Sequence, residues 1–324
     1  MLRALDRLLH DATAGDPITG LLWTHRSMRK LAKALRRRGI KVSPNTIARL
    51  LHDAGFSLRT NRKQLAEVTD PDRDRQFRYL TRLRRLYISR GLPVISVDTK
   101  KKELIGPYKN PGKTWRRKPQ VVFAHDFSSY AVGKAVPYGI YDPAYNAGLV
   151  VVGTSHETPT FAVACIRRWW LMRGRKRYAG AKRLLIQADA GGANDYRKWE
   201  WKVALQKLAD EFDLVITVTH YPPGASKWNP IDHRMFSLIS GNWAGEPLVS
   251  YEKMLKHIRR TRSTTGFHCR AVLDTQEYPT GWKVRPADKA WTRLKPRSVL
   301  PDWNYSIWPH RHHPGCGSNC CAPP

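Results

Sequence analysis

The chain has 324 residues and a formal net charge of +31, with 57 lysines and arginines against 26 aspartates and glutamates. An excess of positive charge this large repels itself unless a polyanion neutralises it, and nucleic acid is the usual polyanion, so the composition predicts DNA as the partner. With 41% hydrophobic residues the chain can bury a sizeable core, but no apolar run approaches the roughly 20 residues of a membrane span, which excludes a helical membrane protein.

The amino terminus and the cysteines favour a cytoplasmic, nucleoid-associated protein. The first residues, MLRALDRLLHDATAGDP, lack the charged-then-apolar order of a signal peptide. Cys165 and Cys269 are isolated and the other three of the five cysteines crowd the last nine residues, which is not the spacing of a disulfide framework.

Residues 1–64 contain the densest positive charge and are predicted to form a small all-α domain. In SMRKLAKALRRRG, Met28, Leu31 and Leu35 recur at helical spacing, and Gly39 is placed to end the helix. In KVSPNTIARLLHDAG, Ser43 is expected to cap a second helix with the proline at its first position. Two short helices joined by a tight turn are typical of a helix-turn-helix, and the alternative is an ordinary basic helical hairpin with solvated side chains.

The side chains expected to contact DNA are basic or polar groups of this domain and of two later segments. One of these segments is a lysine run after the first predicted strand, and the other is a Ser-Lys pair before the last predicted helix. Either segment could instead be solvated charge or part of a turn. The residues are Arg26, Arg29, Lys30, Arg36, Arg37, Arg38, Lys41, Asn45, Thr46, Arg49, Lys100, Lys101, Lys102, Ser226 and Lys227.

Residues 65–91 are predicted to form a connector helix. Phe77, Leu80, Leu83 and Leu86 lie on one apolar stripe, with arginines between them. The stripe is expected to pack on the domain that follows, which leaves the arginines for backbone phosphates.

From residue 92 to 309 the pattern changes to short apolar runs alternating with helical segments. The predicted elements are the strands PVISVDT, QVVFAHDF and GLVVVGTSH, the helix TPTFAVACIRRWWLMRG, the strand RLLIQADAGG, the helix DYRKWEWKVALQKLADEF, the strand DLVITVTHY and a helix from Pro230. Three strands followed by helix, strand, helix, strand and helix is the order of the ribonuclease-H-like fold. We therefore predict an α/β domain with a mixed sheet flanked by helices and a C-terminal helical extension.

Three acids fall at the ends of these elements. Asp98 ends the first strand, Asp189 ends the strand LLIQAD, and Asp232 lies in the first turn of the last helix. Singly, Asp98 and Asp189 are each better explained as ordinary turn residues, but reactive groups in open α/β sheets collect at the carboxyl ends of strands, where the three acids could meet. Converging carboxylates repel each other unless a cation lies between them, and Mg²⁺ prefers such hard oxygen ligands. Two such ions could promote in-line displacement at a phosphodiester.

Short motifs run through the chain from about Gly15 to Pro309. They include WTHRSMRKLAKALRRRGIKVSPNTIARLLHDAGFSLRTNRK, VISVDTKKKELIG, HDF, KAVPYGIYD, FAVACIRRWW, LLIQADAGGAN, HYPPGASKWNPIDHRMFSLISGNW, PLVSYE, YPTGWKV and DWNYSIWP. In this order they resemble bacterial insertion-sequence transposases of the Rhodopirellula-type DDE family, the first motif resembling that family's second helix-turn-helix. NPIDH also resembles the NPIE motif of mariner-like transposases.

The resemblance implies a DNA transposase that cuts element ends and joins them to target DNA. It makes Asp98 and Asp189 the first two ligands of Mg²⁺, for which Mn²⁺ would substitute. Joining two DNA ends implies a homodimer or higher oligomer on DNA.

The chain departs from the family pattern in three places. The third ligand is normally Glu, and Asp232 is one methylene shorter, so a helix shift or a bridging water would have to bring it to Mg²⁺. Family members usually begin with another helix-turn-helix, and Ala190 stands where Gly is usual. Two alternatives stay open: a catalytically impaired DNA-binding relic, and a metal-dependent nuclease or resolvase that cuts without joining.

Residues 310–324, HRHHPGCGSNCCAPP, contain zinc-type ligands, but their spacing fits no standard zinc finger and Gly and Pro surround them. We expect a disordered end rather than a zinc site. The ligand-type residues are His310, His312, His313, Cys316, Cys320 and Cys321.

Overall fold

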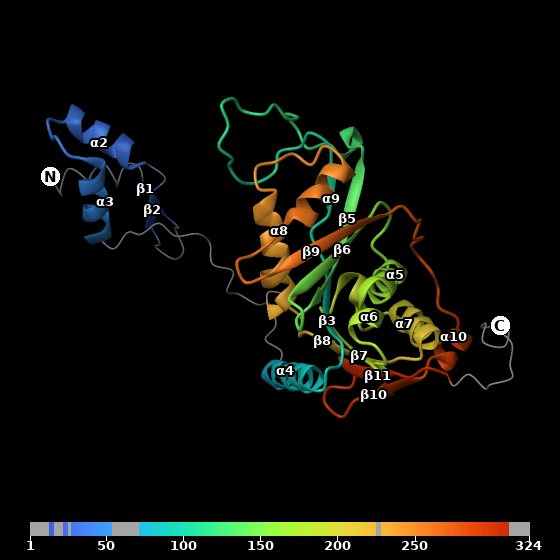
Figure 1. Ribbon diagram of the computed structural model, residues 1–324. Coiled ribbons are helices and arrows are strands. Elements are labelled where there is room, and N and C mark those ends of the chain that lie inside the picture. The colour runs from blue at the N-terminus through green and yellow to red at the C-terminus, as the bar shows by residue number, and fades with distance from the viewer. Residues whose placement is uncertain (1–12, 16–21, 25–26, 54–70, 225–227, 311–324) are drawn as a thin grey trace. The chain divides into compact units, whose positions relative to one another are not determined.

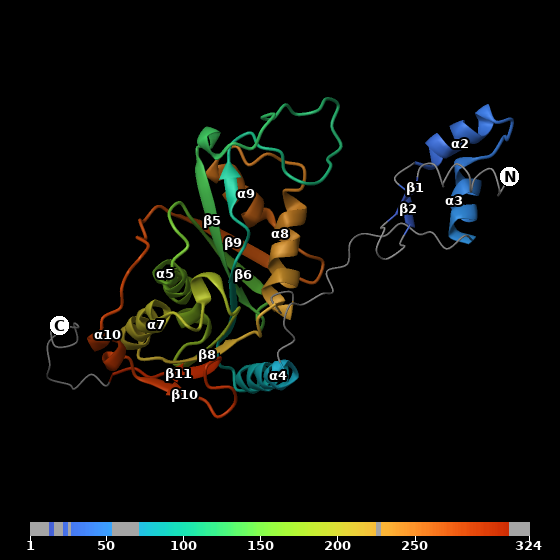
Figure 2. The ribbon, with the colours of Figure 1, turned by 180° about the vertical axis from the view of Figure 1, so that it is seen from behind.

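The computed structural model describes residues 13–15, 22–24, 27–53, 71–224 and 228–310 (Figures 1 and 2). The chain divides into two compact units, residues 1–65 and 66–324. None of the helices in the described ranges is long and apolar enough to span a bilayer.

The first unit contains two short strands and two helices. The strands form an antiparallel pair in which Ala14 lies opposite Trp23. The elements are β1 (Thr13–Gly15), β2 (Leu22–Thr24), α2 (Met28–Arg37) and α3 (Pro44–Asp53).

Both helices of the first unit have the predicted caps. The Gly39 N–H donates to the Arg36 carbonyl, and the Ile40 N–H donates to the Leu35 carbonyl. Gly39 permits this pair of hydrogen bonds because it can adopt a φ of 80°. At the start of α3, the Ser43 hydroxyl accepts the Thr46 N–H at 3.1 Å. The helices then bury a shared apolar face, formed by Leu31, Ala32, Leu35, Ile47 and Leu51.

The second unit is built on one mixed sheet, in which nine strands lie within the described residues. Its order is β10-β11-β8-β7-β3-β5-β6-β9, with the short β4 paired to β5. Strands β3, β7 and β8 are mutually parallel, β5 is antiparallel to both β3 and β6, and β11 is antiparallel to β8. The bounds are β3 (Val94–Thr99), β4 (Glu103–Ile105), β5 (Gly133–Asp142), β6 (Ala147–Gly153), β7 (Arg183–Ala188), β8 (Val215–His220), β9 (His268–Asp274), β10 (Leu294–Pro296) and β11 (Asn304–Ile307).

Helices cover both faces of this sheet (Figure 1). One face carries α5 and α7, and the other carries α8, α9 and, at its lower end, α4. The bounds are α4 (Arg73–Ser89), α5 (Pro159–Trp169), α6 (Arg175–Arg177), α7 (Trp199–Phe212), α8 (Ser237–Asn242), α9 (Tyr251–Arg260) and α10 (Pro286–Trp291), with π-helical turns at Trp170–Gly174 and Asp232–Phe236.

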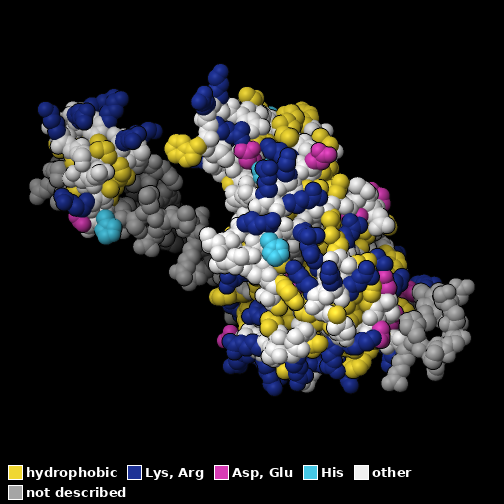
Figure 3. All heavy atoms as spheres, viewed as in Figure 1, with side chains coloured by type: hydrophobic (Ala, Val, Ile, Leu, Met, Phe, Trp, Pro, Cys, Tyr) yellow, Lys and Arg dark blue, Asp and Glu magenta, His cyan; other side chains and the backbone are white. Residues whose placement is uncertain are grey.

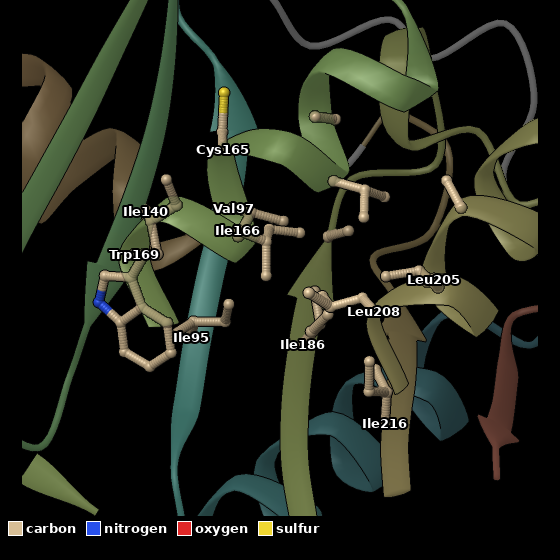
Figure 4. Close-up of a cluster of buried hydrophobic side chains, with 14 of the residues drawn as sticks. Ile95, Val97, Ile140, Cys165, Ile166, Trp169, Ile186, Leu205, Leu208 and Ile216 are labelled. Atoms are coloured by element: carbon tan, nitrogen blue, oxygen red, sulfur yellow. The ribbon is translucent and has the colours of Figure 1, made fainter. Parts of the chain in front are cut away.

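The larger core lies between the sheet and α5 and α7 (Figure 4). Ile95 and Val97 of β3 point into it with Ile186 and Ile216 of the neighbouring strands. Because side chains alternate along a strand, Val94, Ser96 and Asp98 face the opposite side of the sheet. The central order β6-β5-β3-β7-β8, with only β5 reversed, is the ribonuclease-H-like arrangement that the sequence predicts.

The prediction of the second strand is wrong. Residues 120–127 form a loop in which the Val121 side chain is 89% exposed, and the second strand is Gly133–Asp142. This strand contains Pro137, and proline cannot donate a hydrogen bond to a sheet. Pro137 is tolerated because it lies opposite Lys100, just beyond the end of β3, where its carbonyl accepts the Lys100 N–H at 2.9 Å.

Two further predictions need correction. In α4, Leu86 is exposed, and the buried stripe consists of Gln76, Leu80, Leu83 and Tyr87 because the helix packs its polar Gln76 against the carbonyl of His220. The predicted C-terminal helical extension is only partly helical, since β9, β10 and β11 extend the sheet at its two edges.

Gly139 of β5 allows the π-helical turn that begins at Asp232 to approach the sheet. A Cβ at this position would lie 2.5 Å from the Phe236 ring and would also contact Met235. We expect Gly139→Ala to lower the free energy of unfolding by about 1–3 kcal/mol, as overpacking does. Urea unfolding measures this change.

Gly241→Ala is the matched control, because Gly241 lies in α8 with nothing within 4 Å of its added Cβ. It should leave stability unchanged or raise it by up to about 1 kcal/mol. Equal losses in the two variants would contradict the close approach at Gly139.

Candidate active site

The sheet register brings two of the three predicted acids together. Val97 of β3 pairs in parallel with Ala188 of β7, so the next residues, Asp98 and Asp189, lie side by side where the two strands end. Both side chains are half-buried.

Asp232 reaches the same place through Asn229, which is fully buried. The Asn229 side chain accepts a hydrogen bond from the Ser96 hydroxyl and donates to the carbonyl of Val97 at 3.4 Å. The Asn229 carbonyl in turn accepts the Asp232 N–H at 3.1 Å. These contacts join the start of the Asp232 helix to β3, the strand that carries Asp98. The predicted first turn of an α-helix is here a π-helical turn, and regular α-helix follows from Ser237.

The three carboxyl groups influence one another electrostatically. Burial raises the pKa of Asp98 to about 8, and the charges of Asp189 and Asp232 contribute to the rise. Burial also raises the pKa of Asp189, to about 6, and raises that of Asp232. Raised pKa values are expected for acids that share a partly desolvated site.

A buried hydrogen-bond chain holds the Asp189 carboxylate. Asn194 donates to Asp189 Oδ1 at 2.9 Å, and Tyr138 donates its hydroxyl to Asn194 Oδ1 at 2.8 Å. Asn194 was not predicted as a site residue from the sequence, although it lies in the motif LLIQADAGGAN.

The backbone at Asp189 is held by His220. Its Nδ1 lies 2.8 Å from the Asp189 carbonyl, and its Nε2 lies 3.2 Å from the Tyr305 hydroxyl, which accepts the Trp201 indole N–H. A carbonyl oxygen only accepts, so Nδ1 carries the proton. Burial lowers the pKa of His220 to about 4, which keeps the ring neutral in this role.

A fourth acid, Glu157, was also missed. Its charge raises the pKa of both Asp98 and Asp189, and it forms an ion pair with Lys102 at 2.8 Å. The sequence contained a signal for it, because Glu157 follows the strand GLVVVG, and that strand is parallel to β3.

The three lysines that follow Thr99 have different surroundings. Lys100 pairs with Glu103 at 2.9 Å and lies over the Trp243 ring, Lys102 pairs with Glu157, and Lys101 is exposed. The candidates Ser226 and Lys227 lie outside the described residues, as does Arg26.

Most predicted DNA contacts of the first unit are exposed. Thr46 is the exception: it is half-buried, and its hydroxyl bonds to Ser43 at 2.9 Å. The exposed candidates are Arg29, Lys30, Arg36, Arg37, Arg38, Lys41, Asn45 and Arg49.

The donors at the sheet edge suit a hard divalent cation, because all are carboxylate oxygens. As placed, no three His, Cys, Asp or Glu side chains of the described residues are spaced to hold an ion together. Burial and neighbouring acids raise the pKa values of Asp98 and Asp189, and a bound cation would stabilise their charged forms. Beside Asp98, the Thr99 hydroxyl oxygen is buried and has no hydrogen-bond partner among the described residues. The site therefore fits Mg²⁺ in the chemistry of its donors.

His310 is the one zinc-type ligand of the tail that lies within the described residues. His310 bonds to Asp210 through its backbone N–H at 2.7 Å and its ring stacks on Trp291. The other zinc-type ligands, from His312 to Cys321, lie outside the described residues.

The shifted carboxyl groups make stability depend on pH. Asp98 loses its proton near its ordinary pKa of 3.8 when unfolded but near 8 when folded, so the folded state binds the extra proton between these values. The free energy of unfolding of the metal-free protein should therefore fall as pH rises through this window. Because Mg²⁺ competes with this proton, its stabilising effect should be larger at about pH 8.5 than at about pH 6. Thermal unfolding with and without Mg²⁺ measures both effects.

Asp98→Asn supplies the comparison for this pH series. It should make the free energy of unfolding less dependent on pH and remove most of the stabilisation by Mg²⁺. A Mg²⁺ shift of the same size in wild type and Asp98→Asn would contradict a metal site at Asp98.

Asn229→Ala tests whether Asn229 positions Asp232. It should reduce the Mg²⁺-induced rise in Tm, because the Asp232 helix loses its bonds to β3. Asn242→Ala is the control, since Asn242 also donates side-chain bonds, to His257 and Thr261, away from the three acids. If both variants keep the wild-type Mg²⁺ effect, Asn229 does not position a metal ligand.

Comparison with known proteins gives a family match along most of the chain. The family model described as the Rhodopirellula transposase DDE domain matches residues 4–309. No curated protein is significantly similar in sequence.

Solved structures with detectable similarity include transposases and an integrase. The Mos1 transposase paired-end complex with left transposon end is 14% identical, with 79% of this chain and 69% of that chain covered and a TM-score of 0.41. The Mos1 strand transfer complex has the same identity and TM-score, with 79% and 68% covered. The HTLV-2 integrase catalytic core domain in complex with magnesium is 12% identical, with 54% and 90% covered and a TM-score of 0.30.

Proposed function

Since the chain belongs to the Rhodopirellula transposase DDE family, we propose that it is a metal-dependent DNA transposase whose metal ligands are Asp98, Asp189 and Asp232. The observation that carries this proposal is the convergence of the three acids, from three separate segments, on one edge of the sheet. The charges of Asp189 and Asp232, which contribute to the raised pKa of Asp98, support it.

Hydrogen bonds orient two of the three carboxylates in this proposal. Asp98 Oδ1 accepts the Thr99 N–H at 2.7 Å, and Asp189 Oδ1 accepts from Asn194. Mg²⁺ ions bound there would neutralise charge and activate a water or a 3′-hydroxyl for in-line displacement at a phosphodiester. Mn²⁺ would substitute because it accepts the same oxygen ligands.

The π-helical turn at Asp232–Phe236 bears on the shorter third ligand. A π-turn locally widens the helix and is frequent at functional sites. We assign it the role of moving the Asp232 backbone toward Asp98 to offset the missing methylene.

The first unit is proposed to bind element ends through α3, whose exposed Asn45 and Arg49 are placed to contact a groove or phosphates. Its many arginines make this binding salt-dependent. Because two DNA ends must be joined, the active form is proposed to be a homodimer or higher oligomer on DNA.

A DNA-binding relic without catalysis is the second candidate. It is favoured by Asp232 standing where Glu is usual, because the shorter side chain would hold a metal ion less well. A nuclease or resolvase would use the same site and differ only in not joining strands.

Cleavage and strand transfer on labelled element ends with Mg²⁺ or Mn²⁺ test the proposal. Asp98→Asn and Asp189→Asn should each lower both activities by more than about 100-fold, since even outer-shell changes cost 10- to 100-fold. Asp232→Glu should retain or raise them. Asp213→Asn is the matched control, because Asp213 is exposed at a left-handed position that Asn tolerates.

The alternatives give different outcomes in the same assay. Binding of the ends without cutting, even as Asp232→Glu, would establish the relic. Cutting without joining would establish the nuclease.

A further inference from the structure

Between β4 and β5 the chain forms a long loop that projects from the second unit (Figure 1). Residues 107–125 of this loop contain no acid, and they include five basic residues within a stretch of ten. Lys and Arg side chains gather over it in Figure 3. The basic residues are Lys109, Lys113, Arg116, Arg117 and Lys118.

A tryptophan stands in the middle of this basic stretch. The Trp115 side chain is 105% exposed, which means that it contacts almost nothing. Tryptophan is normally buried to a large extent, because its ring carries a large apolar area. A fully exposed ring surrounded by cations is suited to stack on a base while its neighbours contact phosphates.

The loop is fixed on both sides of Trp115. Before it, the Pro111 carbonyl accepts the Gly245 N–H at 2.8 Å, and Gly112 packs so closely that an added Cβ would lie 2.7 Å from Ala244. After it, Arg116 pairs with Glu246. The backbone on either side of Trp115 is therefore held in place, so binding would lose less conformational entropy.

The base of the loop has an aromatic support of its own. The Tyr108 ring lies 5.3 Å from Phe123, and Tyr130 lies 5.6 Å from Phe123 and 5.7 Å from Phe127. Tyr108 also donates its hydroxyl to the Phe127 carbonyl at 2.7 Å. These contacts give the loop a folded base, and Trp115 lies beyond them.

We propose that the loop Lys109–Gln120 is a second DNA-binding element, in which Trp115 stacks on an unpaired base and Lys113, Arg117 and Lys118 contact the adjacent phosphates. The proposal rests on the proposed function only in taking DNA as the partner. A second protein chain is a poorer occupant, because the loop contains Lys109, Lys113 and Lys118 and lysine is depleted at protein interfaces.

Binding of the full chain to labelled DNA in EDTA tests this proposal apart from catalysis. The two DNAs are a blunt duplex and the same duplex with a short single-stranded extension. Wild type should prefer the extended DNA. Trp115→Ala should weaken binding to the extended DNA by about 5- to 150-fold and leave the blunt duplex unchanged, and Trp115→Phe should retain most of the preference.

The double variant Arg117→Ala, Lys118→Ala separates phosphate contacts from stacking. It should weaken binding to both DNAs. It should also reduce the slope of log K against log salt by about 1.4 to 1.8, the value for two lost phosphate contacts. Trp282→Ala is the control, since Trp282 is another exposed tryptophan, held by Lys207. This control should behave as wild type.

Three outcomes would overturn the proposal. One is a wild type that binds both DNAs equally. Another is a Trp115→Ala variant with an unchanged preference. The third is a Trp115→Ala variant that binds DNA normally but has a lower oligomer mass by light scattering, which would assign the loop to a second copy of the chain. Because no metal is present, an inactive enzyme would not change any of these results.

Discussion

The hydrogen bonds between Asn229 and β3 are the contact on which the candidate site depends. Asn229 is buried against Ser96 and Val97, and its carbonyl accepts the N–H of Asp232. Without it, the sheet would bring only Asp98 and Asp189 together, since Asp232 comes from a helix with no register to fix it. Gly139, opposite Asp98, keeps the space into which that helix packs.

The acids are held together against their own repulsion. Asn194 and His220 hold the Asp189 carboxylate and backbone through neutral donors, so neither cancels the negative charge that a cation needs. The protein thus fixes the geometry and leaves the charge uncompensated. An arginine at the same place would give a more stable apoprotein and a weaker metal site.

The sequence allowed local features to be predicted and left non-local ones hidden. The caps at Gly39 and Ser43 and the parallel core strands depend on neighbouring residues or on long apolar runs. In contrast, β5 was hidden by Pro137, which is harmless only because β3 ends opposite it. The strand β11 has four residues, too few to show a periodicity, and Glu157 lay beside a correctly predicted strand without being noticed. The roles of the three acids and of the DNA contacts stay predictions.

The position of β11 links the candidate site to the order in which the chain is made. This strand lies beside β8, and its Tyr305 hydroxyl holds the His220 ring that holds Asp189. A nascent chain emerges from the ribosome with all three acids exposed well before Asn304–Ile307 appears. Its acids would then lack the support that comes from β11. The proposed metal site would therefore be complete only after the last strand of the sheet has been made.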